Sequence, residues 1–133
     1  DPYLAREVKA DGCHLGQNDM DITEAKKILK KKIIGITCHN SLKLARIASL
    51  KNADYIAIGA FYKSLTKIVY FKANITTLKK IKKYIRIPIV AIGGINEKNY
   101  KNLLLNNADF LAISGYIWKN KKLRPQQAIK MFK

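Results

Sequence analysis

The sequence predicts an α/β fold built on a parallel sheet, and two observations carry this prediction. Segments with the apolar spacing of helices alternate with short apolar runs that end abruptly in glycine or small polar residues. The five runs are CHLGQND (13–19), IIGITCH (33–39), YIAIGAFYKSLTK (55–67), IPIVAIGGI (87–95) and FLAISG (110–115). Such alternation is typical of β/α units whose strands pair in parallel. Ligands bind at the carboxyl ends of such strands, so the polar tails are where we expect the function.

Six helices are expected, one before each strand and one after the last. They lie at about 2–9, from Asp21 onward, at about 40–52, at about 75–86, from Asn96 onward, and from Pro125 to the C-terminus. Asp21, with Glu24 three residues later, resembles a capping box, and Asn96 is a suitable N-cap. The strands are β-branched and nearly all apolar, as expected when both faces of a sheet are covered.

The composition predicts one globular domain, residues 1–133, with no linker. The chain is 48% hydrophobic, and no apolar run approaches the roughly 20 residues that span a bilayer. Cys13 and Cys38 show neither a disulfide framework nor a zinc spacing, which favours a cytoplasmic location. The chain begins with Asp1 and opens on a helix, so we expect that this N-terminus is not the natural one.

The charge is strongly basic and unevenly distributed. The formal net charge is +17, yet residues 1–24 carry six acidic residues against Arg6 and Lys9. Such a charge can attract nucleic acid or an acidic membrane surface. Lysine outnumbers arginine 22 to 4, however, and the lysines lie mostly on helix faces, where solvated charge is usual. We therefore expect no specific nucleic-acid or membrane partner.

Three strand ends carry groups that suit a phosphate. Ser64, Thr66 and Lys67 offer two hydroxyls and an ammonium within four residues. Gly93-Gly94 would let backbone amides approach an anion closely. Ser114, with the glycine that follows it, repeats this pattern after the last strand. In barrels, the loops after the last two strands commonly form a phosphate site.

Four other polar residues lie in or just after the expected strands. Asp19 suits a hard cation such as magnesium, or closes an Asx-turn. His14 lies within a strand, where a satisfied core imidazole is the usual case. His39, at a strand end, is the better candidate for acid–base chemistry. Thr37 alternates with His39 and is expected to point into the mouth of a barrel.

In their order along the chain, these motifs resemble those of the thiamine phosphate synthase family. ADGCHLGQND resembles the family's A-D-G-x-H-x-G-Q-x-D, and IGITCHN is similar to its G-x-S-x-H. GAFYKSLTK resembles G-P-x-Y/F-P-T-x-T-K, with Lys63 in place of proline and Ser64 in place of threonine. AIGGI and the pair Ile113-Ser114 complete the series, which covers essentially the whole chain.

The resemblance implies a (β/α)₈ TIM barrel in which this chain supplies strands four to eight, with the first three missing. It implies a transferase of thiamine biosynthesis. The enzyme joins a hydroxymethylpyrimidine pyrophosphate to a thiazole phosphate and releases pyrophosphate with the help of Mg²⁺. The motif that grips the pyrimidine pyrophosphate would lie on the missing strands. We therefore expect this chain alone to be inactive and its full-length parent to be a synthase.

The resemblance also implies roles for individual residues. Asp19 would be a magnesium ligand, and Thr37 and Lys67 would be catalytic. The substrates and their phosphate groups would be held by Thr37, Ser64, Thr66, Lys67, Gly94, Ile113 and Ser114.

Two alternatives remain open at the level of the sequence. One is a thiazole tautomerase-like isomerase, which shares the fold and would use His39. The other is a non-catalytic basic remnant. Exposed sheet edges would also make the chain prone to association, so a homo-oligomer is possible.

Overall fold

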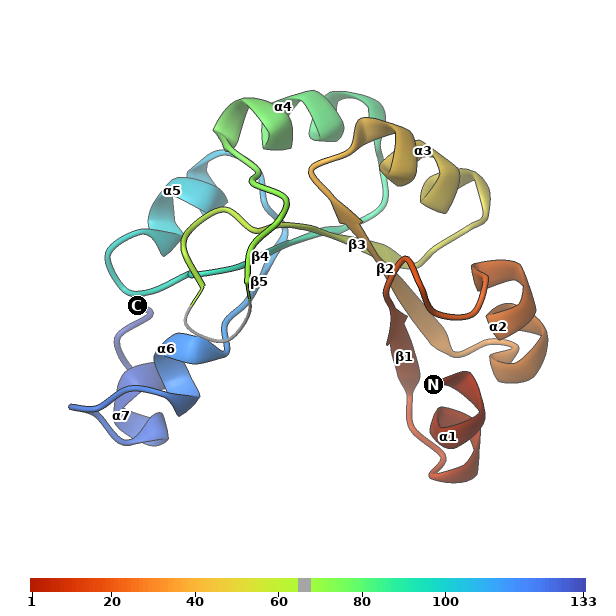
Figure 1. Cartoon of the computed structure of the whole chain (residues 1–133), viewed down its shortest axis with the longest axis horizontal. Helices are drawn as coiled ribbons and strands as arrows, with labels where there is room; N and C mark the ends of the chain where they lie inside the picture. The colour runs from red at the N-terminus through yellow and green to blue at the C-terminus, as the bar shows by residue number, and fades with distance from the viewer. Residues whose placement is uncertain (65–67) are drawn as a thin grey trace.

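Five parallel strands, paired in the order in which they occur along the chain, form one sheet in the computed structural model, which describes residues 1–64 and 68–133. They are β1 (Gly12–Leu15), β2 (Ile33–His39), β3 (Tyr55–Gly59), β4 (Ile89–Ile92) and β5 (Phe110–Ala112). The sheet bends into an open arch with helices along its convex side (Figure 1). The five expected strands are thus confirmed, and every pair is parallel.

The helices follow the expected alternation, with differences at their ends. They are α1 (Pro2–Glu7), α2 (Ile22–Leu29), α3 (Leu42–Leu50), α4 (Ile75–Tyr84), α5 (Tyr100–Leu105), α6 (Gly115–Trp118) and α7 (Pro125–Ile129). The short helix α6 was not expected from the sequence. Within the described residues, no helix has the length and apolar character needed to cross a membrane.

Two expected helix starts need comment. Asp21 caps α2, but its carboxylate accepts from the Thr23 amide, one residue earlier than a capping box requires. The expectation that Asn96 caps the fifth helix is wrong, because α5 begins at Tyr100. The Asn96 side chain accepts from the Lys98 amide, and the Asn96 amide donates to the Asn99 side chain at 2.9 Å. These local bonds close a separate turn before the helix.

The two faces of the sheet differ in character. The convex face carries fully buried apolar side chains that pack against the helices, among them Leu15, Ile34, Ile56, Ile58 and Ile89. Each such side chain contributes about 1.5–3 kcal/mol to stability. The concave face carries polar residues such as His14, and Phe110 there is 60% exposed. The expectation of two covered faces therefore holds only on the helix side.

Three helix-to-strand junctions share one structure. Each has a residue with a left-handed φ, then an alanine whose amide donates back to a helix carbonyl five residues earlier, then an aspartate. The junctions are Lys9-Ala10-Asp11, Asn52-Ala53-Asp54 and Asn107-Ala108-Asp109, with left-handed φ values of 55°, 58° and 69°. This bond pattern is that of a Schellman ending, and it turns the chain from the helix into the next strand.

Two of these aspartates also fix the register of neighbouring strands. The Asp109 amide donates to the Ile89 carbonyl at 3.0 Å, and its carboxylate accepts from the Ile89 amide at 2.8 Å. Asp54 makes the same reciprocal pair with Ile34. Lys82 donates to Asp109 at 2.6 Å. A side chain thus closes the hydrogen-bond ladder where β2 meets β3 and where β4 meets β5.

We predict that Asp109→Ala destabilises the fold. The substitution removes the acceptor of the Ile89 amide at the buried start of β4, and an unpaired buried amide costs roughly 1–3 kcal/mol. Urea denaturation followed by circular dichroism measures the change. Glu7→Ala, at the exposed end of α1, is the control and should stay within about 0.5 kcal/mol of the parent chain. Equal stabilities of the two variants would contradict the proposed role of Asp109.

The same carboxylate predicts a pH dependence. Burial disfavours its charge, but the hydrogen bonds from Lys82 and Ile89 outweigh burial, so the pKa of Asp109 is lowered. A carboxyl with a lowered pKa in the fold contributes stability above its unfolded pKa of about 3.9, and this is lost as the pH falls through the folded value. The stability difference between the parent chain and Asp109→Ala should therefore shrink below about pH 4.

Candidate active site

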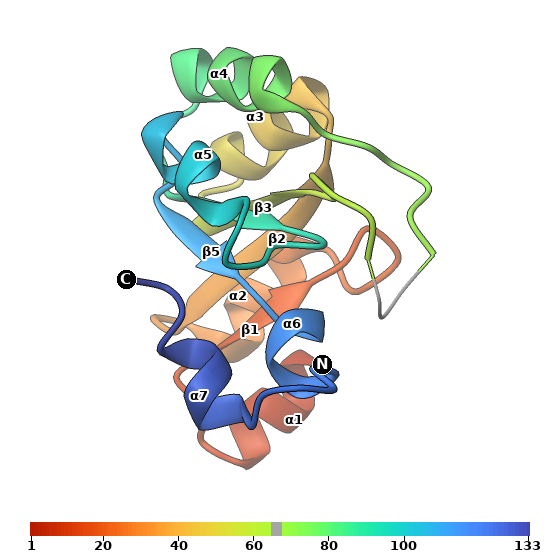
Figure 2. The ribbon, with the colours of Figure 1, turned by 90° about the vertical axis from the view of Figure 1, so that its left-hand side faces the viewer.

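A pocket of about 760 Å³ lies at the carboxyl ends of β2 to β5. Turned by 90°, the molecule shows residues 60–64 and 68–74, which lie between β3 and α4, projecting beyond the sheet (Figure 2). Five residues expected from the sequence line this pocket together: Thr37, Ser64, Gly94, Ile113 and Ser114. Thr66 and Lys67 lie outside the described residues. The topology thus brings segments from four strand ends into one pocket.

Gly93-Gly94 forms a wall of backbone. Both residues have left-handed φ values, 96° and 64°. A Cβ on Gly93 would lie 2.2 Å from the Ala60 Cβ, and one on Gly94 would lie 2.3 Å from the Lys63 carbonyl oxygen. The Tyr62 amide donates to the Gly93 carbonyl at 3.0 Å. Only glycine allows this close approach of the two loops, which holds Lys63 in the pocket lining.

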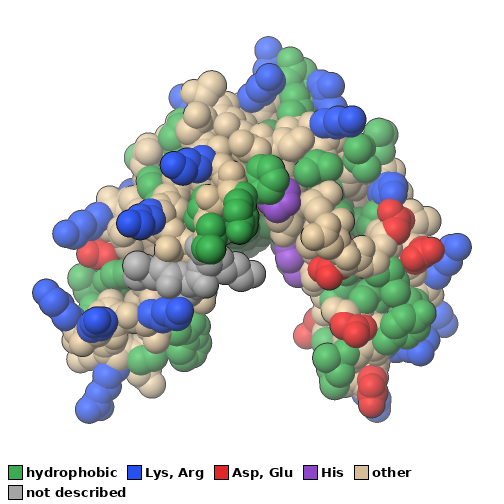
Figure 3. Space-filling view, viewed as in Figure 1, with side chains coloured by type: hydrophobic (Ala, Val, Ile, Leu, Met, Phe, Trp, Pro, Cys, Tyr) green, Lys and Arg blue, Asp and Glu red, His purple; other side chains and the backbone are tan. Residues whose placement is uncertain are grey.

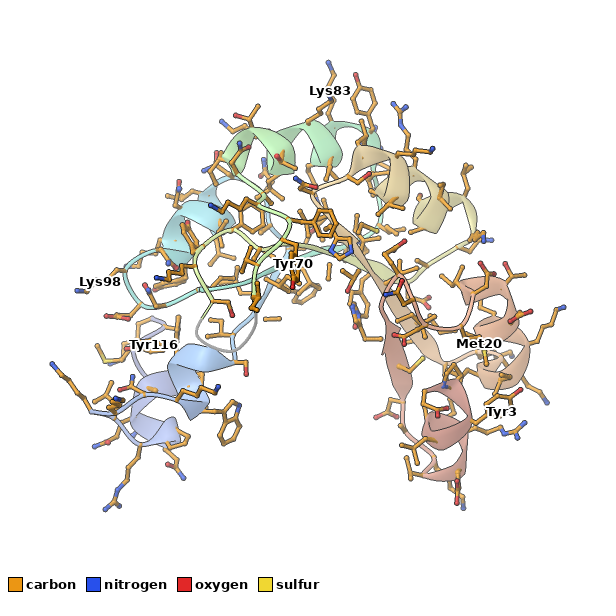
Figure 4. All side chains as sticks on the ribbon, in the orientation of Figure 1. Tyr3, Met20, Tyr70, Lys83, Lys98 and Tyr116 are labelled. Atoms are coloured by element: carbon orange, nitrogen blue, oxygen red, sulfur yellow. The ribbon has the colours of Figure 1, made fainter. Side chains whose placement is uncertain are left out.

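The opposite part of the pocket is aromatic. The His39 ring stacks on Phe71, with ring centroids 4.2 Å apart. The backbone of Phe71 is held because its carbonyl accepts from the Ala60 amide at 3.0 Å. The Asn40 side chain also donates to the Lys72 carbonyl at 3.0 Å. Tyr70, 81% exposed, lies on the concave side of the arch (Figure 4).

His14 does not have the surroundings expected of it. The sequence suggested a core imidazole, but the side chain is exposed on the concave face. Its Nδ1 lies 3.0 Å from the Tyr55 hydroxyl, and its Nε2 lies 2.8 Å from Thr37 Oγ1. Desolvation lowers the pKa of His14, and the charge of Asp19 partly opposes that change. Strand β1 places this residue on the inner face because side chains alternate along a strand.

Asp19 lies in the loop after β1 and is exposed. Its Oδ2 accepts from the Gly16 amide at 2.6 Å, which closes the turn that the sequence allowed. Asp19 is not part of the pocket lining. The described residues contain no group of three or more His, Cys, Asp or Glu side chains that could hold a metal ion. Asp19 therefore offers a single carboxylate.

The acidic side chains are unevenly distributed along the arch, as the sequence indicated. Figure 3 shows most acidic side chains on the arm that carries α1 and α2, whereas basic side chains lie over the top and on the outer edges of both arms. Hydrophobic side chains and the histidines lie along the hollow between the arms. Asp21 caps α2 on the arm with most of the acidic side chains, and hydrogen bonds from Lys51 and Thr23 lower its pKa to about 2.

Sequence reasoning missed three residues of this region. Tyr70 and Phe71 follow the GAFYKSLTK motif in the sequence. Their apolar character gave no reason to place them in the pocket. Tyr55 was counted only as part of an apolar strand. The strand register could have identified Tyr55, because Tyr55 pairs with Gly35 and Gly35 pairs with His14. That pairing becomes visible only when the strands are aligned.

The sheet and the pocket define a parallel β/α protein with a pocket at the carboxyl ends of its strands. The thiamine monophosphate synthase family model matches residues 1–117, and the chain belongs to that family. It is 62% identical over 133 residues to the thiamine-phosphate synthase of Pelagibacter ubique (strain HTCC1062), covering 100% of this chain and 64% of that protein.

Two further relatives agree. The chain is 45% identical over 126 residues to the thiamine-phosphate synthase of Nitrosospira multiformis, covering 94% of this chain and 54% of the relative. The solved structure of thiamine phosphate pyrophosphorylase from Pyrococcus furiosus superposes with a TM-score of 0.86 at 32% identity, covering 99% of this chain and 62% of that one. The chain thus spans between 54% and 64% of the length of these three relatives.

We predict that His14 titrates below 6.5 and that Asp19→Asn lowers its pKa further, because the Asp19 charge is the influence that raises it. The asparagine oxygen can still accept from Gly16, so the turn is kept. Proton NMR titration of the His14 ring measures both values. Asp11→Asn is the control and should leave the His14 midpoint in place. A midpoint above 6.5, or a rise in Asp19→Asn, would contradict the described surroundings.

Proposed function

We propose that this chain forms the last five β/α units of a thiamine phosphate synthase, and that its strands correspond to strands four to eight of an eight-stranded TIM barrel. The transferase would condense hydroxymethylpyrimidine pyrophosphate with thiazole phosphate. One observation carries the proposal: Thr37, Ser64, Gly94, Ile113 and Ser114, named from the family motifs, line a single pocket. The open arch and the coverage of the relatives support the strand correspondence.

The pocket has two parts that suit the two halves of such a substrate. Backbone at Gly93-Gly94 and the hydroxyls of Ser64 and Ser114 would face phosphate oxygens, and Lys63 adds a positive charge to this wall. The stacked pair of His39 and Phe71 offers an aromatic surface to a flat heterocycle.

Catalysis by these residues would be mostly positioning and charge stabilisation. Departure of pyrophosphate leaves a pyrimidine cation, which the thiazole nitrogen captures. Hydroxyl and amide donors aimed at the leaving oxygens stabilise the charge that develops there. Thr66 and Lys67, outside the described residues, complete the phosphate-binding set in this proposal, with Lys67 and Thr37 as the catalytic residues.

A magnesium ion is compatible with the residues present. Mg²⁺ is often held by only one or two carboxylates, with water and substrate phosphates completing its octahedron. Asp19 is exposed, and its Oδ1 has no hydrogen-bond partner among the described residues. Asp19 would therefore be one ligand, and the ion would help to neutralise the pyrophosphate charge.

The alternative activity is that of a thiazole tautomerase-like isomerase, and the place of His39 in the pocket favours it. An isomerase needs neither a metal ligand nor a pyrophosphate grip. We also propose a cytoplasmic location and small phosphorylated substrates in place of nucleic acid or membrane. Association into homo-oligomers through the exposed sheet edges is part of the same proposal.

The test is a chimera in which residues 1–133 replace the matching part of the Pelagibacter ubique synthase. We predict that the chimera forms thiamine phosphate and that residues 1–133 alone do not. Asp19→Ala in the chimera should reduce magnesium-dependent turnover at least about 100-fold, in the range expected for loss of an electrostatic contributor. Product formation is followed by chromatography.

Glu24→Ala is the matched control, because it removes another exposed carboxylate a few residues away, in the first turn of α2. It should leave turnover close to that of the parent chimera. Full magnesium-dependent activity in Asp19→Ala would contradict the metal role. Isomerisation of the thiazole without condensation, unaffected by Asp19→Ala and abolished by His39→Asn, would establish the alternative.

A further inference from the structure

A chain of hydrogen bonds crosses the concave face of the sheet and ends at the pocket. The Tyr55 hydroxyl lies 3.0 Å from His14 Nδ1, and His14 Nε2 lies 2.8 Å from Thr37 Oγ1. Of these three residues, Thr37 alone lines the pocket. These hydrogen bonds therefore link Tyr55, outside the pocket lining, to the hydroxyl of Thr37 within it.

A glycine makes this link possible. The strand register places His14, Gly35 and Tyr55 in one row across β1, β2 and β3. A Cβ on Gly35 would lie 2.0 Å from Tyr55 Cζ, so the phenol ring lies directly over Gly35. Because Gly35 has no side chain, Tyr55 reaches across β2 to a residue two strands away. No other residue type at position 35 would leave that path open.

The protonation states limit how the chain can be polarised. Desolvation lowers the pKa of His14 and raises the pKa of Tyr55, so both groups are neutral near pH 7. A neutral imidazole has one donor nitrogen and one acceptor nitrogen. Hydrogen-bond donation can therefore proceed in only two directions: from Tyr55 through His14 to Thr37, or from Thr37 through His14 to Tyr55.

The acidity of the two hydroxyls selects one direction. A phenol has a pKa of about 10 and is a better donor than the aliphatic hydroxyl of threonine. The Tyr55 hydroxyl therefore donates to Nδ1 of His14, and the Nε2 hydrogen of His14 donates to Thr37 Oγ1. The hydrogen of the Thr37 hydroxyl is then left for a partner in the pocket. The Gln17 side chain also donates to the Thr37 carbonyl at 2.5 Å and holds the backbone there.

We propose that Tyr55 is a positioning residue which, through His14, sets the Thr37 hydroxyl as a hydrogen-bond donor to the anionic ligand of the pocket. The identity of the ligand as an anion rests on the proposed function. The direction of the hydrogen bonds from Tyr55 through His14 to Thr37 does not depend on it. In the opposite direction, Thr37 would give its hydrogen to His14 and turn lone pairs toward the phosphate oxygens. Setting the donor in advance removes that unfavourable arrangement.

The experiment uses residues 1–133 labelled with ¹⁵N at histidine. The chain has only two histidines, so the ring signals of His14 and His39 can be assigned by substitution. Two-bond ¹⁵N–¹H spectra at pH 8 report the tautomer of each ring. We expect His14 in the Nε2–H form. In Tyr55→Phe, which removes the donor to Nδ1, we expect a mixture of both tautomers.

Affinity for inorganic pyrophosphate, measured by calorimetry, tests the link to the pocket. Loss of a set hydroxyl donor corresponds to about one neutral hydrogen bond, so Tyr55→Phe should weaken binding up to about five-fold. Thr37→Val removes the hydroxyl itself and should weaken binding at least as much. Tyr84→Phe makes the same chemical change on α4, at a tyrosine that is 50% exposed, and should alter neither readout.

Each outcome decides one claim. A His14 ring in the Nδ1–H form in the parent chain, or a tautomer that Tyr55→Phe leaves unchanged, overturns the role of Tyr55. A changed tautomer with unchanged pyrophosphate affinity overturns the link from His14 to the ligand. A parent chain that binds no pyrophosphate contradicts the anionic ligand of the proposed function, while the tautomer still decides the direction of the chain.

Discussion

The reciprocal hydrogen bonds between an aspartate and the start of the neighbouring strand are the interaction on which the rest of this structure depends. Asp54 and Asp109 each give an amide and a carboxylate to one residue of the adjacent strand. Side chains alternate from that point, so the choice of register decides which residues face the helices and which face the hollow. A slip by one residue would turn Ile89 toward the hollow and Val90 into the core.

The fold was largely predictable because its signals are local. Apolar runs and helical spacing lie in the sequence itself, and the repeated Asn-Ala-Asp marks two of the strand starts. The wrong expectations concern positions where a side chain has more than one hydrogen-bond partner within reach. Asn96 is a good N-cap by type, yet Asn99 offers a competing bond that closes a separate turn. A turn at Asn96 and a helix cap at Asn96 differ by only a few hydrogen bonds. The residue types alone do not show which of the two forms.

The site was predictable where motifs marked strand ends, and not where strands meet side by side. Thr37 lies near the end of β2, and Gly94 and Ser114 follow β4 and β5, so these residues were expected near one another. Tyr55 and His14 are 41 positions apart and meet only because Gly35 lies between them in the register. The surroundings of His14 were therefore misjudged, since the sequence shows that a histidine is in a strand but not which face receives it.

The strands pair in the order in which they occur along the chain, and this order determines how the sheet can unfold. Each strand pairs only with the strands that precede and follow it in the chain, so the sheet is assembled from contacts between neighbouring β/α units. In this respect the arch resembles a solenoid, where each repeat is stabilised by its two neighbours and terminal repeats by one. From this order we expect unfolding to begin at the edge strands β1 and β5, and the central strand β3 to open last. Tyr55, which starts β3, therefore lies on the strand that we expect to be most protected from local unfolding.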